Sequence, residues 1–412
     1  MRPYLEILRI PGALKFSSAG LLARSGGAMM GIGLVLMVSG LYGSYELAGA
    51  LAAANGFAWA LGTAVLSNLV DRFGQRRVML PAVVLSSASL SALVVLAMIQ
   101  APVWTLFVAA MLSGATGGAP GALVRARWNH ITTDPGQLHT AFALESTLDE
   151  VTFVVGPVLA TALATLVHPA AGLVLPVILS LAGALVFYSQ RDTEPPILPR
   201  QALTGARPPL RERLVILFPG IGAVVAVNLL IGAMFGSIDI SVVAAATAMD
   251  ARGASGIILA VFSVGSALAG FYYGARFWRS PLAARFVVGV VAMLITTLGL
   301  LAANSVVLLG AIGLAVGVTI APTLINGNTL IKRLAPASRL TESLSWMSTG
   351  IGIGASLGSS VAGKAIDTAG YHAGFWVVVI AAASASAIAA GSYLTLRRLT
   401  SSTEPEVVPA PA

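Results

Sequence analysis

Long apolar runs alternate with short polar turns along this chain, and the pattern repeats about twelve times at the length of a membrane span. Each run holds roughly 20 apolar residues, which is what an α-helix needs to cross the hydrocarbon core of a bilayer. The runs are continuous, whereas strands of a membrane β-barrel alternate apolar and polar positions. Because a helix satisfies its own backbone polar groups in lipid, the pattern predicts an all-α integral membrane protein.

The expected spans are Phe16–Leu41, Tyr45–Val70, Val78–Ile99, Pro102–Leu123, Ala141–Leu166, Ala170–Tyr188, Leu214–Phe235, Ser255–Phe277, Ala284–Ala303, Val306–Leu330, Ser343–Val361 and Gly374–Leu396. The longest polar interval lies near the middle of the chain. We therefore expect a six-helix bundle at 1–190, a cytoplasmic linker at 191–213, a second six-helix bundle at 214–398 and a disordered tail at 399–412.

The two halves share features at a constant offset. A shift of 202 residues places Pro120 on Pro322 and Gly156 on Gly358. Parallel repeats of this kind relate the halves of many transporters by an axis along the membrane normal. The offset thus favours two bundles related by pseudo-two-fold symmetry.

Composition supports the membrane assignment. Hydrophobic residues make up 57% of the 412 residues and charged residues 10%, whereas a soluble domain is about 25% charged. The mean hydropathy is +0.89. Glycine occurs 44 times, which suits close helix packing in lipid. The chain has no cysteine, so disulfides and thiolate metal sites are excluded.

The basic residues behind the net charge of +8 lie mostly on one side of the expected membrane. If successive loops lie on alternate sides, one side carries Arg2, Arg9, Lys15, Arg72, Arg76, Arg77, Arg127, Arg191, Arg200, Arg207, Arg211, Arg213, Arg276, Arg279, Arg285, Lys332, Arg333, Arg339, Arg397 and Arg398. The other side carries Arg252 and Lys364. This asymmetry predicts that both termini are cytoplasmic. It also favours contact with anionic membrane lipids and argues against nucleic acid as a partner.

A charged turn between the second and third spans carries a motif. The stretch from Ser67 to Arg77 resembles the loop pattern G-x-L-x-D-R-x-G-R-(R/K) of major facilitator superfamily transporters, at Leu69, Asp71, Arg72, Gly74, Arg76 and Arg77. Ser67 and Gln75 depart from the pattern. The resemblance implies the twelve-helix fold of that superfamily, with efflux-type bacterial members as the nearest kind.

That resemblance gives the turn a role. In the superfamily the turn contacts the other half and holds the outward-facing state, so Asp71, Arg72, Gly74, Arg76 and Arg77 are expected to form a conformational latch. Asp71 would lie near a helix N-terminus, where a carboxylate is favoured. The alternative is a solvated basic loop that fixes topology.

The fifth span carries three carboxylates in an apolar setting. Glu145 and Asp149 are four residues apart and share a helix face, while Glu150 points elsewhere. Buried acids in lipid need a partner or a wet cavity. We expect Arg24 and Arg125 to join Glu145 and Asp149 in a buried cluster, with Glu150 as the acid most available for titration. The cluster acts in proton coupling or gating, or it is a static ion-pair network.

Gly156-Pro157 in the same span resembles a signature of the superfamily's antiporters and is expected to kink the helix. It favours export over import. The arginine expected early in the fourth helix of drug antiporters is missing, where Met111 to Pro120 stand instead.

The second half shows almost no charge within its expected spans. Its candidates for the substrate cavity are Asn228, Asn326, Asn328 and Trp346. An amide and an indole suit an amphipathic or apolar substrate. The alternative is interhelical hydrogen bonding by the amides and interfacial anchoring by the indole.

Catalytic, metal and nucleotide motifs are missing from the sequence. We therefore expect no enzymatic activity, no cofactor and no metal. The expected protein is a monomeric, multi-pass transporter of the cytoplasmic membrane that moves a small molecule by alternating access, with proton-coupled export favoured. A proton-coupled importer or uniporter, a membrane enzyme acting on lipids, and a non-transporting scaffold or sensor are the alternatives.

Overall fold

The computed structural model describes residues 2–197, 215–218, 220–276, 278–336 and 339–401. The helices of the first half are α1 (Arg2–Leu8), α2 (Ala13–Tyr42), α3 (Tyr45–Phe73), α4 (Gln75–Met98), α5 (Val103–Gly117), α6 (Pro120–Ile131), α7 (Pro135–Leu166) and α8 (Ala171–Ser189). The longer helices of the second half are α10 (Ile221–Ala248), α11 (Ser255–Gly274), α12 (Leu282–Leu298), α13 (Val306–Leu334), α14 (Leu340–Ala369) and α15 (Tyr371–Ser401). Short 3₁₀ turns are η1 (Val215–Leu217), η2 (Arg252–Ala254) and η3 (Gly299–Ala302).

Membrane-spanning character runs through the described chain. Eleven helical segments are long and apolar enough to cross a bilayer, with α5 and α6 counted as one segment. The 30-residue helix α14 is not among them, and it stands where the sequence predicts the eleventh span. The all-helical membrane fold expected from the sequence is confirmed.

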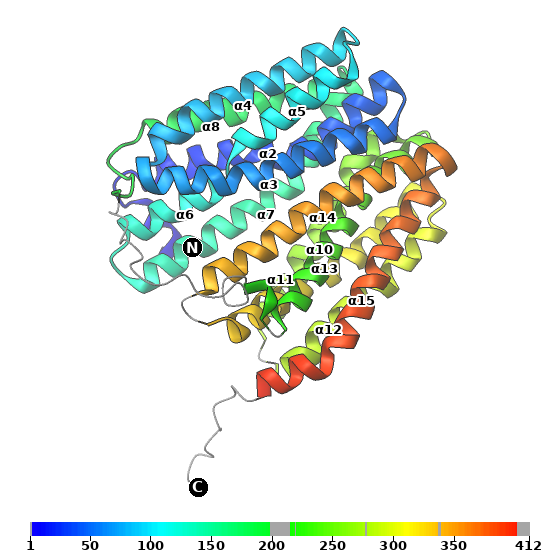
Figure 1. Ribbon diagram of the computed structural model, residues 1–412. Coiled ribbons are helices and arrows are strands. Elements are labelled where there is room, and N and C mark those ends of the chain that lie inside the picture. The colour runs from blue at the N-terminus through cyan, green and yellow to red at the C-terminus, as the bar shows by residue number, and fades with distance from the viewer. Residues whose placement is uncertain (1, 198–214, 219, 277, 337–338, 402–412) are drawn as a thin grey trace.

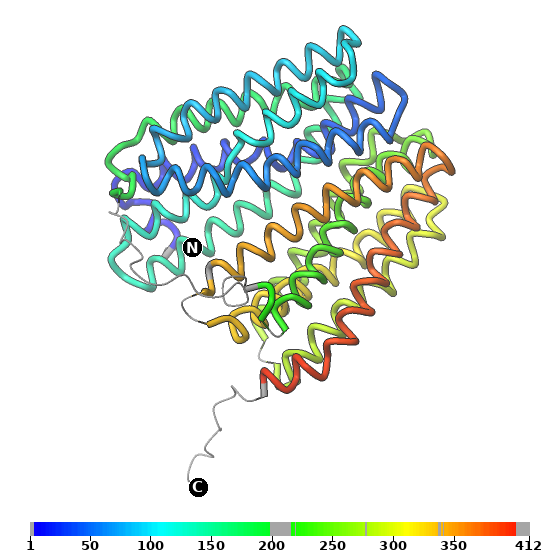
Figure 2. Tube along the Cα trace, in the orientation of Figure 1, coloured from blue at the N-terminus to red at the C-terminus, as the bar shows by residue number. Residues whose placement is uncertain are grey.

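The helices gather in two bundles (Figures 1 and 2). In the first bundle α2 packs against α8, α3 against α5, and α4 against both α5 and α8. In the second bundle α10 packs against α15, α11 against α13, and α12 against both α13 and α15. These pairs occupy the same ordinal positions in each half, so the two bundles repeat one packing scheme. Across the halves, α3 contacts α14 and α7 contacts α11.

Small residues set the closeness of these contacts. A Cβ added at Gly354 of α14 would overlap the carbonyl oxygen of Leu229, and one added at Gly236 of α10 would overlap that of Ala355. Across the halves, Gly49 of α3 lies against the carbonyl of Ser359 in the same way. Helix α14 therefore approaches α10 and α3 backbone to backbone, as glycine-rich membrane helices do.

Several helix boundaries differ from those expected, and three of the differences affect the candidate site. Helix α7 begins at Pro135 rather than near Ala141, because Asp134 caps it by accepting from the Gln137 amide at 2.9 Å. The fourth span breaks between α5 and α6, where Gly118 has φ 65°. Pro120 then starts α6, which extends to Ile131. Helix α10 runs to Ala248, 13 residues beyond the expected end at Phe235.

The domain limits remain predictions. Most of the expected linker, 198–213, and the tail from 402 onward lie outside the described residues. We call the end of the molecule that holds the α2–α3, α10–α11 and α14–α15 connections the far end. We call the end that holds the α3–α4 turn the basic end.

The α10–α14 packing makes a first prediction. Gly354→Ala forces two backbones apart, so we expect it to destabilise the protein by on the order of 1–3 kcal/mol, the usual cost of overpacking. The matched control is Gly391→Ala on α15, where an added Cβ meets nothing within 4 Å. Thermal unfolding in detergent should give a lower Tm for Gly354→Ala and an unchanged or higher Tm for the control. Equal Tm values would contradict the backbone contact.

Candidate functional site

Four charged side chains meet inside the first bundle, and they are the four that the sequence analysis grouped. The Arg24 guanidinium on α2 contacts the Glu145 carboxylate through Nη2. Its Nε lies 2.9 Å from Oδ1 of Asp149, and Asp149 Oδ2 lies 2.7 Å from Nη2 of Arg125. Glu145 and Asp149 both project from α7, one turn apart, so a single arginine can reach both. We call Arg24, Arg125, Glu145 and Asp149 the charge cluster.

The charge cluster has a buried part and an exposed part. The Glu145 side chain is 0% exposed, whereas those of Asp149 and Arg125 are 28% and 32% exposed. Glu145 also accepts from the Ser17 hydroxyl at 2.6 Å and from the Trp128 indole at 2.7 Å. Both carboxylate oxygens of Glu145 are therefore satisfied by protein donors that take the place of water. A molecule or proton that reaches the charge cluster meets Asp149 and Arg125 first.

Glu150 stays outside the charge cluster. It lies on another face of α7, as the one-residue step from Asp149 requires, and is half-buried. Within the described residues it makes no ion pair and no side-chain hydrogen bond. It is therefore the unpaired acid of the three on this helix.

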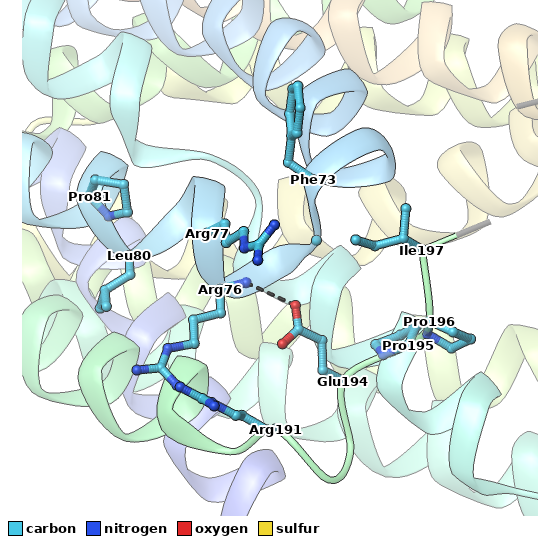
Figure 3. Close-up of a pocket in the computed structure, with 11 residues that line it drawn as sticks. Phe73, Arg76, Arg77, Leu80, Pro81, Arg191, Glu194, Pro195, Pro196 and Ile197 are labelled. Atoms are coloured by element: carbon cyan, nitrogen blue, oxygen red, sulfur yellow. Dashed lines mark hydrogen bonds between the residues drawn. The ribbon is translucent and has the colours of Figure 1, made fainter. Parts of the chain in front are cut away.

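The α3–α4 turn is held by an acid from another segment. Gly74 has φ 87°, which lets α4 start directly after α3. The amide of Arg76, in the first turn of α4, donates to Glu194 Oε1 at 3.0 Å (Figure 3). Asp71 is exposed in the last turn of α3. The carboxylate at the N-terminus of α4 is thus Glu194 rather than the expected Asp71.

A cavity of about 610 Å³ lies beside this turn and is lined by Arg76, Arg77 and Arg191 among others. Figure 3 shows the Arg76 and Arg191 side chains next to each other at its edge, with Pro195 and Ile197 on the opposite side. In this conformation the turn contacts the segment that follows α8, within the first half. The latch role of Asp71, Arg72, Gly74, Arg76 and Arg77 stays a prediction for the opposite conformation.

Arg127 is a structural residue that the sequence placed in a loop. It lies in α6, is 0% exposed and donates to Gln75 Oε1, the Gln190 carbonyl and Thr193 Oγ1 at 2.8–3.0 Å. Its guanidinium carbon also stands 4.0 Å from the centroid of the Phe187 ring. Arg127 therefore ties α4, α6 and α8 together at the basic end. The large apolar ring of Trp128, next to it in the sequence, is the feature that indicates burial of this segment.

The amide and indole candidates of the second half do not form one group. Asn228 is 1% exposed and donates to the Val224 carbonyl of its own helix at 2.8 Å. Asn326 is buried and accepts from the Tyr273 hydroxyl at 3.0 Å. Asn328 is exposed and Trp346 is half-buried. A cavity role for these four residues stays a prediction.

Gly156 and Pro157 lie within α7, which continues past them to Leu166. A Cβ on Gly156 would lie 3.2 Å from side-chain atoms of Ala28 and Met29 on α2. Gly156 is therefore a point of close approach between α7 and α2, whereas the Pro157 carbonyl lies against Gly256 of α11. The kink at these residues stays a prediction.

Asp239 corrects the view that the second half has almost no charge within its spans. It lies inside α10, nine residues before the helix ends at Ala248. The expected end at Phe235 had left Asp239 outside the span. The apolar run from Ile238 to Ala248 was the signal that α10 continues.

Hydrogen bonds join the two halves at the far end. Asp367 of α14 accepts from the amides of Tyr45 and Glu46 at 2.9 and 2.8 Å and from the Ser44 hydroxyl at 2.8 Å. Arg252, between α10 and α11, donates to the Leu36 carbonyl at 3.0 Å and Ser39 Oγ at 2.8 Å on α2. We call these contacts of Asp367 and Arg252 the far-end lock. Asp367 contacts the N-terminus of α3, and Arg252 contacts the last two turns of α2.

Known proteins with this architecture are transporters. A family model described as "Major Facilitator Superfamily" matches residues 16–274. A point mutant of the nucleoside transporter NupG superposes with a TM-score of 0.75 at 14% identity, covering 93% of this chain and 99% of that chain. An auto-inhibited peptide transporter of the POT family has a TM-score of 0.71 at 14% identity, covering 98% of each chain. The human organic anion transporter MFSD10 has a TM-score of 0.62 at 13% identity, covering 94% of this chain and 100% of that chain. No curated protein sequence matches this chain.

The burial of Glu145 makes a second prediction. Glu145→Gln leaves Arg24 with one anionic partner instead of two, and breaking a buried ion pair costs on the order of 3–5 kcal/mol. We expect a lower Tm and a smaller monodisperse fraction in size-exclusion chromatography. The control is Glu6→Gln, which removes the same charge from an exposed position of α1. A Tm for Glu145→Gln equal to that of the control would mean that the charge cluster does not hold the bundle together.

Proposed function

Because the chain belongs to the Major Facilitator Superfamily, we propose that it is a secondary transporter that moves a small molecule across the cytoplasmic membrane by alternating access. It carries out no chemical conversion of that molecule and needs no cofactor. The observation that carries the proposal is the far-end lock, which joins the two bundles by a few hydrogen bonds. Each bundle is internally close-packed, so opening at the lock leaves two rigid bodies that rock about the remaining contacts between the halves, such as that of α3 with α14.

The far-end lock is suited to repeated opening. Asp367 places a negative charge at the N-terminus of α3, and Arg252 places a positive charge near the C-terminus of α2. Both charges complement the helix dipoles, and such contributions amount to about 0.3–1 kcal/mol for an exposed charge such as Asp367 and up to ~2 kcal/mol for a partly buried one such as Arg252. A lock of this strength closes one end without trapping the protein there.

The distribution of basic residues supports an inward-open conformation. The basic end is cytoplasmic if the positive-inside rule holds, and both termini then lie in the cytoplasm. The far-end lock then closes the outer side. In the opposite conformation the α3–α4 turn is proposed to contact the second half and to act as the latch.

The charge cluster supports proton coupling. Arg24 and Arg125 balance the charges of Glu145 and Asp149, so the net charge of the charge cluster is zero when both acids are ionised. A proton on Asp149 would remove one anion that holds both arginines and would let the exposed part rearrange. Glu150, which lacks a partner among the described residues, is the second candidate for proton binding.

Export is the direction that we propose, on the Gly156-Pro157 resemblance to the superfamily's antiporters. Proton entry down a membrane potential contributes about 2.3 kcal/mol per 100 mV and can drive it. A proton-coupled importer or uniporter remains the alternative, and counterflow in proteoliposomes with an imposed pH gradient separates the two. A scaffold or sensor would show no transport in either direction.

The far-end lock makes a third prediction. Asp367→Asn removes the carboxylate from the α3 N-terminus, so the outer side should open more often. The native chain has no cysteine, and Gly27→Cys places one thiol where an added Cβ meets no atom within 4 Å. We expect an impermeant maleimide added outside to label this thiol about two- to fivefold faster in the Asp367→Asn background.

The matched control for this labelling is Asp250→Asn. Asp250 is an exposed far-end aspartate with φ 54°, a conformation that Asn also tolerates. Labelling in the Asp250→Asn background should equal that of the parent. Equal labelling in the Asp367→Asn background would show that the lock does not control access.

Proton coupling makes a fourth prediction. In proteoliposomes that carry a pH dye, Asp149→Asn and Glu150→Gln should each lose solute-dependent proton movement, since neither amide binds a proton at neutral pH. Membrane insertion should be normal, and exposed Asp192→Asn should behave as wild type. Proton movement that persists in both span variants would remove α7 from the coupling pathway.

A further inference from the structure

Asp239 is a carboxylate deep in a membrane helix. It lies 18 residues after the start of α10 at Ile221 and nine before its end at Ala248, so it stands at least about 13 Å from either helix end. A charge at such depth is costly unless it is paired or faces a polar space. Acids of this kind mark pathways for ions or substrates.

Within the described part of the chain, Asp239 has no cationic partner. Among the described residues it makes no ion pair and no side-chain hydrogen bond. Arg24 and Arg125 are engaged by Glu145 and Asp149. Arg252 follows α10 and donates to α2 instead.

Asp239 faces the other half of the molecule. Its Oδ2 lies 3.7 Å from the position that a Cβ on Gly31 would occupy, and no other atom lies within 4 Å of that position. Gly31 is on α2, the helix that carries Arg24. The carboxylate therefore points into the interface between the bundles rather than toward lipid.

Open space continues from this point toward the basic end. Gly27 lies one turn before Gly31 on the same face of α2, and an added Cβ there meets nothing within 4 Å. Gly27, Gly31 and Asp239 are all reached by solvent in this conformation. Arg24 lies one further turn along that face, about 10 Å from the level of Gly31. Asp239 and the charge cluster thus lie along the same solvent-accessible face of α2, at two different depths.

The balance of charge along this face determines what it attracts. The charge cluster is neutral, so Asp239 is the carboxylate on this face that has no cationic partner among the described residues, and it lies opposite two glycines. We propose that Asp239 binds the positively charged group of the transported molecule, which is an organic monocation whose body lies along Gly27 and Gly31. The inference rests on the proposed transport function and names its substrate class.

Binding to purified protein in lipid nanodiscs tests the proposal. Tetraphenylphosphonium, ethidium and tetraethylammonium serve as cations, uridine as the neutral probe and para-aminohippurate as the anion, measured by equilibrium dialysis. We expect wild type to bind at least one of the cations, and Asp239→Asn to bind it at least about tenfold more weakly. Asp239→Glu, which keeps the charge, should stay within about threefold of wild type.

Two controls separate binding from folding. Asp250→Asn removes an exposed aspartate at the end of the same helix and should bind as wild type. The Tm of Asp239→Asn should not fall, because the described structure holds no ion pair for it to lose. A loss of Tm would assign Asp239 a structural role and overturn the proposal.

The outcomes also distinguish this inference from the transport function. Failure of all three cations to bind wild type, or equal binding by Asp239→Asn, overturns the cation site. If uridine or para-aminohippurate is bound and transported equally by wild type and Asp239→Asn, transport stands and the cation site falls. If no probe is bound or moved, both proposals fail.

Discussion

The bilayer interior offers no water to solvate a charge, and this constraint orders the rest of the structure. In the first bundle, Glu145 and Asp149 are each matched by an arginine, and Glu145 gains two further donors. In the second bundle, Asp239 receives no such match among the described residues. The charge cluster on one side of the interface is thus self-contained, whereas the acid on the other side has no cationic partner among the described residues.

A second consequence of the lipid environment is how the bundles are joined. Within a bundle, helices such as α10 and α14 meet backbone to backbone at glycines, with no room for adjustment. Between the bundles, α3 and α14 also meet backbone to backbone at Gly49, and the far-end lock adds hydrogen bonds near the ends of α3 and α2. Close packing inside each bundle, with the α3–α14 contact and the far-end lock between the bundles, is compatible with two bodies that move as units.

The sequence predicted what depends on local spacing. Glu145 and Asp149 are one turn apart, so their shared face and their need for Arg24 and Arg125 followed from helix geometry and the cost of buried charge. Asp239 was missed because the expected helix ended at Phe235, and Arg127 because its helix was expected to stop at Leu123. The expected end of α10 was wrong because its apolar residues continue after the short polar interruption at Gly236 and Ser237. The contacts of Glu194 with Arg76 and of Asp367 with Tyr45 join residues 118 and 322 positions apart, so no local pattern could have indicated them.

The capping of α3 by Asp367, a residue of the other half, has a consequence for α3 itself. Ser44 caps the Leu47 amide from within the first half, whereas the Tyr45 and Glu46 amides depend on a carboxylate of the second half. If the halves part at the far end, as proposed, these two amides lose their acceptor and hydrogen-bond to water instead. The start of α3 should then fray, and amide hydrogen exchange at these two residues would report the separation of the halves.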